Sequence, residues 1–305
     1  MSHRSRAAGV LVVAGAALLT SIGSVAVAQA APTFPPSVAA LFDSGSAAFG
    51  SSALAADAPR LASIDNFRDV AGTGPGYTGL AGLHVNKGVF YRANAMVPND
   101  ADMVTLTGLK LSTVFDLRSD DEVGKKPDVL PDGVTYTHLP IGAGDYTTVL
   151  SQIKSVDDSR AFMQEMNRQF VTGENARTQF GAMLTDMATA TGPAVFHCTG
   201  GKDRTGWASY LLLSIAGVDP HTIMNDYLLT NEYTKDSIAK SLATLQSYFG
   251  DAAANMAPLV SVESSFLQAG IDQLTADYGT IDRYLTDGLG LSHQTILALK
   301  AKLLG

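Results

Sequence analysis

The chain of 305 residues is long enough for one large domain with a sizeable core, and its formal net charge of −8 makes it acidic overall. An acidic surface disfavours non-specific nucleic-acid binding, so any positive charge that attracts an anionic ligand must be local. The one cysteine excludes an internal disulfide. The histidines show no spacing typical of zinc ligands, and we expect neither a metal nor a cofactor.

Residues 1–30 have the pattern of a secretory signal peptide. Two basic residues, Arg4 and Arg6, precede an apolar run rich in Ala, Val and Leu. Ala28 and Ala30 then supply the small residues of a cleavage site, so we expect cleavage after Ala30 and a secreted protein, extracellular or periplasmic. The alternative is an uncleaved membrane anchor, because about 20 apolar residues can span a bilayer.

A folded domain is expected over residues 61–305, after a flexible lead-in at 31–60 that is rich in Ala, Ser and Pro. Short β-branched and aromatic runs there alternate with longer helical patterns. This alternation predicts an α/β fold with a central, largely parallel sheet flanked by helices. The expected strands are 88–93, 112–119, 134–141 and 193–198, and the helical stretches between them include 99–111 and 155–190.

After the last expected strand, the sequence predicts helices as far as residue 304. Residues 205–217 are apolar on nearly every side, which is typical of a buried helix, and Gly217 is expected to end it. Asp219 and Pro220 then have the residue types that begin a helix. Helical propensity continues over 234–269, with interruptions at Gly250 and Pro258, and 280–304 predicts two helices, the last capped by Ser292.

The string FHCTGGKDRTG places the cysteine between an expected strand and an expected helix. Gly200 and Gly201 allow the backbone to turn tightly and to approach a ligand closely, because glycine has no Cβ. The inward N–H groups of such a turn and the positive end of the following helix make an anion-binding site. The same positive field favours the thiolate form of Cys198.

A thiolate facing a bound phosphate monoester suggests hydrolysis by nucleophilic catalysis. Cys198 would attack phosphorus, the alcohol would leave, and water would then cleave the phosphocysteine. Arg204 would hold two phosphate oxygens with its planar fork, and Thr205 would donate a hydrogen bond to the sulfur. The other loop residues have supporting roles: His197 orients the loop from behind, Thr199, Gly200 and Gly201 cradle the phosphate, Lys202 suits a second phosphate, and Asp203 could protonate the leaving oxygen.

HCTGGKDRTG resembles the Cys-x5-Arg-Thr signature of the protein tyrosine phosphatase superfamily. Its Lys-Asp pair resembles the secreted bacterial PtpB-like branch of atypical tyrosine and phosphoinositide phosphatases. The strings NFRDVAG, VFYRAN, VFDLRSDDEV and DYLLTN agree in order, so the resemblance extends from Ile64 to Leu304. It implies a phosphatase-type sheet flanked by helices, metal-free hydrolysis and a helical lid, which we place at residues 234–262.

The identity of the general acid is left open. The Trp-Pro-Asp loop that usually carries it in the superfamily is absent from the sequence. The resemblance points instead to Asp203 within the loop, and the competing carboxyls are Asp145 and Asp116. Asp116 and Arg118 lie at the end of an expected strand. At this position we expect them to brace the loop rather than to take part in the chemistry.

Several charged or aromatic residues match family positions but also have a simple structural explanation. These are Asn66, Arg68, Asp69, Arg92, Asp226 and Tyr227. Arg92 could reach a distal phosphate, although a salt bridge is the simpler interpretation. Helix packing is the simpler interpretation of the last two residues, and SDDEVGKKPD, residues 119–128, is interpreted as a solvated loop.

The sequence therefore predicts a secreted cysteine phosphatase that acts on phosphotyrosine in proteins or on phosphoinositides. The alternative is an extracellular inositol-polyphosphate phosphatase that scavenges phosphate, since an acidic protein suits a free soluble substrate better than an anionic membrane. A phosphate-binding module without turnover is a third possibility, against which the intact loop argues. No nucleic-acid partner is expected, and membrane contact would be transient and limited to the case of a lipid substrate.

Overall fold

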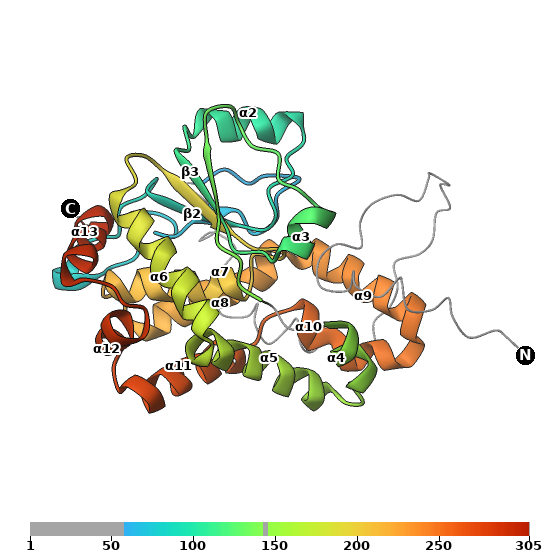
Figure 1. Cartoon of the computed structure of the whole chain (residues 1–305). Coiled ribbons are helices and arrows are strands. Elements are labelled where there is room, and N and C mark those ends of the chain that lie inside the picture. The colour runs from blue at the N-terminus through green and yellow to red at the C-terminus, as the bar shows by residue number, and fades with distance from the viewer. Residues whose placement is uncertain (1–57, 143–145, 305) are drawn as a thin grey trace, which may run out of the picture.

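The computed structural model describes residues 58–142 and 146–304. The expected signal peptide, nearly all of the lead-in, and Asp145 lie outside these ranges. Within them the chain forms a five-stranded sheet with helices packed around it (Figure 1). No helix in the described part is long and apolar enough to cross a bilayer.

The sheet has the strand order β1-β2-β5-β3-β4, with β1 antiparallel to β2 and the other neighbours parallel. Its strands are β1 Arg68–Asp69, β2 Phe90–Ala93, β3 Thr113–Asp116, β4 Thr135–His138 and β5 Ala194–His197. The four predicted strands and the largely parallel α/β fold are confirmed. β1 has two residues, too few for a strand pattern to be visible in the sequence. β5 lies between β2 and β3, so the segment that follows it leaves from the middle of the sheet.

Alternating side chains of the strands bury two hydrophobic clusters, one on each face of the sheet. Phe115 and Phe196 belong to the larger cluster, which also contains apolar residues of the helices that follow β4 and β5. Val114 and Val195 belong to the smaller cluster on the other face, which contains Leu106 of α2. Both faces are therefore covered, as a parallel sheet requires.

The helices before β5 are α2 Asp100–Gly108, α3 Asp120–Lys125, α4 Tyr146–Gln152, α5 Val156–Thr172 and α6 Glu174–Thr189, with the 3-10 turn η2 at Leu80–Gly82. After β5 follow α7 Arg204–Ile215, α8 Pro220–Tyr233, α9 Lys235–Phe249, η3 Gly250–Met256, α10 Ala257–Val260, α11 Ser264–Tyr278, α12 Ile281–Arg283, the π-turn η4 Tyr284–Gly288 and α13 His293–Leu304. The expected helical stretch 155–190 divides at Gly173, which ends α5 and caps α6.

The predicted helix ends after β5 are confirmed by their caps. α7 is buried at every residue but one, and Gly217 follows it with a φ of +70°. The Asp219 carboxylate accepts hydrogen bonds from the N–H groups of His221 and Thr222, which begins α8. At the last helix, the Ser292 hydroxyl accepts from the N–H of Thr295 at 3.0 Å.

The interpretation of residues 119–128 as a solvated loop is wrong, because Asp120–Lys125 form α3. Ser119 and Glu122 make a capping box, in which each side chain bonds the backbone N–H of the other residue. The acidic first turn also complements the positive end of the helix. The Ser-x-x-Glu spacing was therefore a helix signal.

The segment 234–262, expected to be a lid, is helical and consists of α9, η3 and α10. Ile238, Leu242 and Ala257 form a small hydrophobic cluster of their own within it. η3 and α10 also contact α5. Movement of this segment as a lid stays a prediction.

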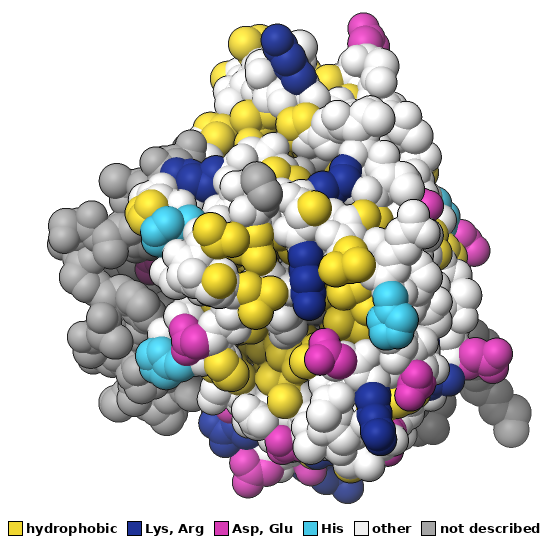
Figure 2. All heavy atoms as spheres, turned by 90° about the vertical axis from the view of Figure 1, so that its left-hand side faces the viewer, with side chains coloured by type: hydrophobic (Ala, Val, Ile, Leu, Met, Phe, Trp, Pro, Cys, Tyr) yellow, Lys and Arg dark blue, Asp and Glu magenta, His cyan; other side chains and the backbone are white. Residues whose placement is uncertain are grey.

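The face of the molecule that carries α13 shows no concentration of one charge. Figure 2 views this face, the left-hand side of Figure 1, and hydrophobic side chains lie there between scattered charges of both signs. Positive potential for an anion is not gathered on this face.

Candidate active site

The cysteine lies where the sequence predicts, between the central strand and the buried helix. β5 ends at His197 and α7 begins at Arg204, so Cys198 opens the connecting turn and is itself buried. Gly201 has a φ of +66°, and a Cβ there would lie 2.5 Å from the carbonyl oxygen of Ala93. Only glycine fits this position, because any side chain would collide with the backbone of β2.

Arg204 is fixed by a carboxylate that the sequence analysis did not assign to the site. Its Nη1 and Nη2 each donate to one oxygen of Glu122, both at 2.7 Å. Nη1 also lies 3.2 Å from the carbonyl oxygen of Leu117 and 3.1 Å from that of Ile141. The hydroxyl of Thr199 donates to the same carboxylate. Glu122 thus ties both ends of the loop to α3.

The charge of Glu122 is stabilised by these partners. Burial raises the pKa of this carboxyl, but the hydrogen bonds and positive charge of Arg204, with the bond from Thr199, outweigh burial and bring it to about 2. The Ser-x-x-Glu spacing was the signal that could have revealed Glu122, because it places this side chain in the first turn of a helix after the strand end.

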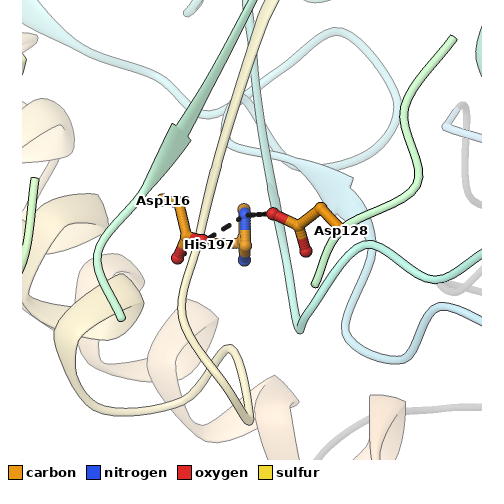
Figure 3. A group of neighbouring side chains, drawn as sticks. All are labelled: Asp116, Asp128 and His197. Atoms are coloured by element: carbon orange, nitrogen blue, oxygen red, sulfur yellow. Dashed lines mark ion pairs between the residues drawn. The ribbon is translucent and has the colours of Figure 1, made fainter. Parts of the chain in front are cut away.

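A buried cluster of charged residues surrounds His197, the residue that precedes the cysteine (Figure 3). His197 Nε2 lies 2.9 Å from Asp128 Oδ2 and 3.8 Å from Asp116 Oδ1. The guanidinium of Arg118 lies 2.7 Å from Asp116 and 2.8 Å from Asp128. His197 Nδ1 is 3.3 Å from the carbonyl oxygen of Cys198. The cluster therefore joins the end of β3 and the segment after α3 to the start of the loop.

Asp116, Asp128 and His197 offer three ligand atoms within 4.8 Å of one another, close enough for a metal ion. Arg118, however, already contacts both carboxylates, and its cation occupies the place that a metal charge would take. The arrangement therefore fits an ion network better than a metal site. The sequence analysis had included Asp128 in a solvated loop, and nothing in the sequence indicated that it is buried against His197.

A second buried network holds the far side of the loop. Asp226 of α8 pairs with Arg68 at 3.2 Å and with Arg92 at 3.0 Å. Arg92 Nη2 and Asn66 Nδ2 both donate to the carbonyl oxygen of Gly201, at 3.0 and 2.6 Å. Burial, followed by repulsion from Arg68, lowers the pKa of Arg92 to about 9, and Asp226 opposes this shift. Arg92 therefore forms the salt bridge that the sequence analysis considered the simpler interpretation. Because its side chain is fully buried, it has no access to a distal phosphate.

Lys202 and Asp203 contact each other rather than open solvent. Lys202 Nζ lies 3.0 Å from Asp203 Oδ2 and 3.4 Å from the carbonyl oxygen of Ser261, at the end of the expected lid. Both side chains are buried. The expectation that Lys202 meets a second phosphate therefore does not match this arrangement, in which its ammonium is already paired.

The surroundings of the three candidate carboxyls distinguish how well each could act as the general acid. Asp116 is buried behind the loop; burial raises the pKa of its carboxyl, but bonds from Arg118 outweigh burial and lower it. A carboxyl held in its charged form does not suit the donation of a proton. Asp203 stays a prediction, and Asp145 lies outside the described residues.

Thr205 lies in the first turn of α7, and its hydroxyl is buried without a hydrogen-bond partner among the described residues. The bond to the sulfur predicted from the sequence is therefore not formed in this arrangement. A buried hydroxyl without a partner is costly, which fits a group that finds its partner in another state of the site. Its role stays a prediction.

The cysteine begins a glycine turn that leads into a helix N-terminus, and a carboxylate orients the arginine that follows. This arrangement is the one expected of a cysteine-dependent phosphatase. Residues 59–305 match the sequence profile of the tyrosine phosphatase family, and the chain belongs to this family. The resemblance found from the loop and its neighbouring motifs is thereby confirmed.

Named relatives agree with this assignment. A protein of Cupriavidus necator named as a tyrosine-protein phosphatase is 32% identical over 233 residues, which cover 74% of this chain and 82% of the relative. The triple specificity protein phosphatase PtpB of Mycobacterium tuberculosis is 27% identical over 279 residues, covering 79% and 96%. The crystal structure of P. aeruginosa TpbA aligns with 59% of this chain and 91% of its own, at 16% identity and a TM-score of 0.28.

Proposed function

We propose that the protein is an exported phosphatase that hydrolyses phosphotyrosine or phosphoinositide monoesters through a phosphocysteine intermediate. The observation that carries this proposal is the position of Cys198 at the start of the anion-binding turn, with Arg204 held beside it by Glu122. Membership of the tyrosine phosphatase family supports the phosphotyrosine part. Export rests on the signal-peptide pattern of residues 1–30.

In the first step the Cys198 thiolate attacks phosphorus. A sulfur–phosphorus bond forms while the bond from phosphorus to the alcohol oxygen breaks, and that oxygen takes a proton from the general acid. In the second step water attacks phosphorus, the sulfur leaves with the bonding electrons as a thiolate, and the acid recovers a proton from the water. Phosphate is the product, and no electrons are gained or lost overall.

Arg204 supplies positive charge to the phosphoryl oxygens in both steps. Its bidentate pair with Glu122 and its contacts to two backbone carbonyls fix the plane of the guanidinium. An arginine that is already oriented loses less rotamer entropy when a phosphate binds. The loop therefore binds phosphate with its main cation in place.

Asp203 is our proposed general acid, because it lies in the loop itself and is next to Arg204. Lys202 Nζ lies 3.0 Å from Asp203 Oδ2, so the ammonium must move away before this oxygen can face a leaving group. Asp203→Asn should then lower turnover most for substrates with a poor leaving group, such as an alkyl phosphate, and least for an aryl phosphate. A matching effect from Asp145→Asn, with none from Asp203→Asn, would assign the acid to Asp145.

The substrate range is proposed to include more than phosphotyrosine. The relative from Mycobacterium tuberculosis carries a name that states triple specificity, and the match covers 96% of its length. The Lys202-Asp203 pair of the loop resembles the loop of the PtpB-like branch, to which this relative gives its name.

The test measures phosphate release by the chain from Ala31 onward, with chelator present. The substrates are a phosphotyrosine peptide, a water-soluble short-chain phosphoinositide and inositol hexakisphosphate, and the comparison variant is Cys198→Ser. Turnover that the substitution abolishes, with a labelled phosphoenzyme trapped by acid quench, supports the proposal. Turnover that survives in Cys198→Ser would refute it, and a preference for inositol hexakisphosphate would favour the scavenging function.

A further inference from the structure

The carbonyl oxygen of Gly201, within the cysteine loop, accepts hydrogen bonds from two buried side chains. Asn66 Nδ2 donates to it at 2.6 Å, and Arg92 Nη2 donates at 3.0 Å. Asn66 comes just before β1 and Arg92 is part of β2, so both donors approach from the same side of the loop. The peptide group that joins Gly201 to Lys202 therefore has its carbonyl fixed toward this side.

The orientation of that carbonyl also fixes the N–H of Lys202, which belongs to the same peptide group. The described residues contain no cis peptide bond, and in a planar trans peptide the C=O and N–H groups point in opposite directions. The Lys202 N–H therefore points away from β1 and β2. Because β5 lies between β2 and β3, it points toward the β3 side of the loop. The guanidinium of Arg204 is held on that side by the carbonyl oxygens of Leu117 and Ile141, which follow β3 and β4.

The N–H groups of the loop have no acceptor within the described part of the protein. Among residues 58–142 and 146–304, no carbonyl or side chain accepts a hydrogen bond from the N–H of any residue from 199 to 203. Backbone donors inside a protein are normally paired, so a run of unpaired ones indicates a place for a ligand. A phosphoryl group beside Arg204 would supply the acceptor for the Lys202 N–H.

Asn66 has a backbone and a side chain that suit this single task. Its φ is +60°, in the left-handed region that asparagine adopts more readily than most residues with a side chain. The side chain is buried, and its Oδ1 accepts from Arg68 Nη1. The amide nitrogen is thereby left to face Gly201 and, at 3.5 Å, the hydroxyl of Thr230. With both ends of the amide engaged, it can hold only this orientation.

We propose that Asn66 is a positioning residue of the active site, which holds the Gly201 carbonyl so that the Lys202 N–H donates to a phosphoryl oxygen of the substrate. The inference rests on the proposed function, because it assumes that the phosphoryl group binds between Cys198 and Arg204. Asn66 acts through one peptide group and does not itself touch the substrate. The ammonium of Lys202 has no part in this contact.

The test changes the amide donor of Asn66 in two ways. Asn66→Asp keeps the shape of the side chain, the acceptor for Arg68 and the tolerance of a positive φ, but turns an oxygen toward the Gly201 carbonyl. Asn66→Gly removes the amide without adding a charge and also tolerates a positive φ. The control is Tyr77→Phe, which removes a hydroxyl that donates to Asp226 in the same buried network and leaves both donors to Gly201 in place.

Nuclear magnetic resonance can observe the Lys202 amide almost alone. Labelling the glycine carbonyl carbon with ¹³C and the lysine nitrogen with ¹⁵N selects only the amides of Lys125 and Lys202, because both follow a glycine and no other lysine does. Inorganic phosphate should move the Lys202 amide proton downfield, as a hydrogen bond to an anion does, and leave exposed Lys125 unchanged.

Both Asn66 variants should lose this response of the Lys202 amide. The inhibition constant of inorganic phosphate should rise about tenfold, the size of one lost charge-assisted bond. The kcat/KM for an aryl phosphate should fall about 100-fold, since the same donor faces the charge of the transition state. Tyr77→Phe should keep all three properties of the unaltered protein.

The outcomes separate this inference from the proposed function. An equal response of the Lys202 amide to phosphate in the unaltered protein and in the Asn66 variants would overturn it. Losses in Tyr77→Phe as large as those in the Asn66 variants, or losses in Asn66→Asp alone, would also overturn it, because the network or the added charge would then explain them. Phosphate that inhibits the unaltered protein without moving the Lys202 amide would overturn it even if neither variant folded. Absence of both turnover and phosphate binding in the unaltered protein would instead refute the proposed function.

Discussion

Replacing Glu122 by glutamine tests the most specific feature of the site, the carboxylate that holds both ends of the loop. Glutamine has the same shape and can still form a capping box with Ser119. It loses the negative charge, and if its amide oxygen keeps the bond from the Ser119 N–H, its amide nitrogen takes the place of Oε1. There it faces both Nη2 of Arg204 and the hydroxyl of Thr199. One of the two 2.7 Å bonds to Arg204 is therefore replaced by a repulsive contact between donors.

The magnitude follows from the pKa of Glu122, which falls from 4.5 to about 2 on folding. A depression of this size corresponds to about 3 kcal/mol of stability at neutral pH. Because the folded pKa is the lower one, this contribution is complete above about pH 5 and disappears as the pH falls from 4.5 to 2. For activity, misplacement of Arg204 should cost about 2–3 kcal/mol, or about 30- to 150-fold in kcat/KM.

The assay is denaturant unfolding of the unaltered chain and of Glu122→Gln at neutral pH and near pH 3, with kcat/KM measured on an aryl phosphate. Asp121→Asn is the matched control, because this exposed residue lies in the same first turn of α3. We expect a stability difference of about 3 kcal/mol at neutral pH that shrinks in acid, and little effect in the control. A difference that does not change with pH would refute the ionic account of this contact.

Three further predictions concern the loop, its cysteine and the buried network of Asp226 on the far side of the loop. Gly201→Ala should destabilise the fold by about 1–3 kcal/mol and weaken phosphate binding, as measured by unfolding and by product inhibition, because its φ is +66°. Gly200→Ala, whose Cβ would meet only the flexible Lys202 side chain at 3.7 and 4.0 Å, should destabilise less, and equal losses would contradict the argument. Hydrogen peroxide should inactivate the enzyme by oxidising Cys198, and inorganic phosphate should slow this; equal rates of inactivation with and without phosphate would count against a thiol in the anion site. Asp226→Asn should cost about 3–5 kcal/mol in unfolding experiments, since two buried arginines lose their counter-charge, and exposed Asp236→Asn should cost little.

The parts of the fold that the sequence predicts are those with a strong local signal. Four strands are short β-branched runs, and the helix after the loop is apolar on nearly all sides. The turn that carries Cys198 could be predicted because strand, glycines and helix start are consecutive in the chain. Asp219 and Ser292 cap their helices as expected, since capping acts within one turn.

The parts that could not be predicted depend on contacts between distant residues. Glu122 and Arg204 are 82 positions apart, and Asp226 meets Arg68 across 158. Asp128 resembles any surface acid in a charged segment, yet it is buried against His197. A local pattern does not show which of several acids folds against the loop. Sequence reasoning therefore predicted the turn that carries Cys198 and a bracing position for Asp116, and it missed Glu122 and Asp128.

On the proposed function, the carboxylates Glu122, Asp128 and Asp226 reconcile an acidic protein with an anionic substrate. Each one faces a cation that it positions: Glu122 holds Arg204, Asp128 lies against Arg118 and His197, and Asp226 holds Arg92. Arg92 in turn donates a hydrogen bond to the carbonyl oxygen of Gly201. The acids thus satisfy the structural cations from behind and leave the N–H groups of the loop to the ligand. On this account, removing a supporting carboxylate disorders the anion site instead of strengthening it, although the substitution makes the protein less negative. Asp226→Asn and Glu122→Gln should therefore both weaken phosphate binding, whereas a simple view based on net charge predicts tighter binding.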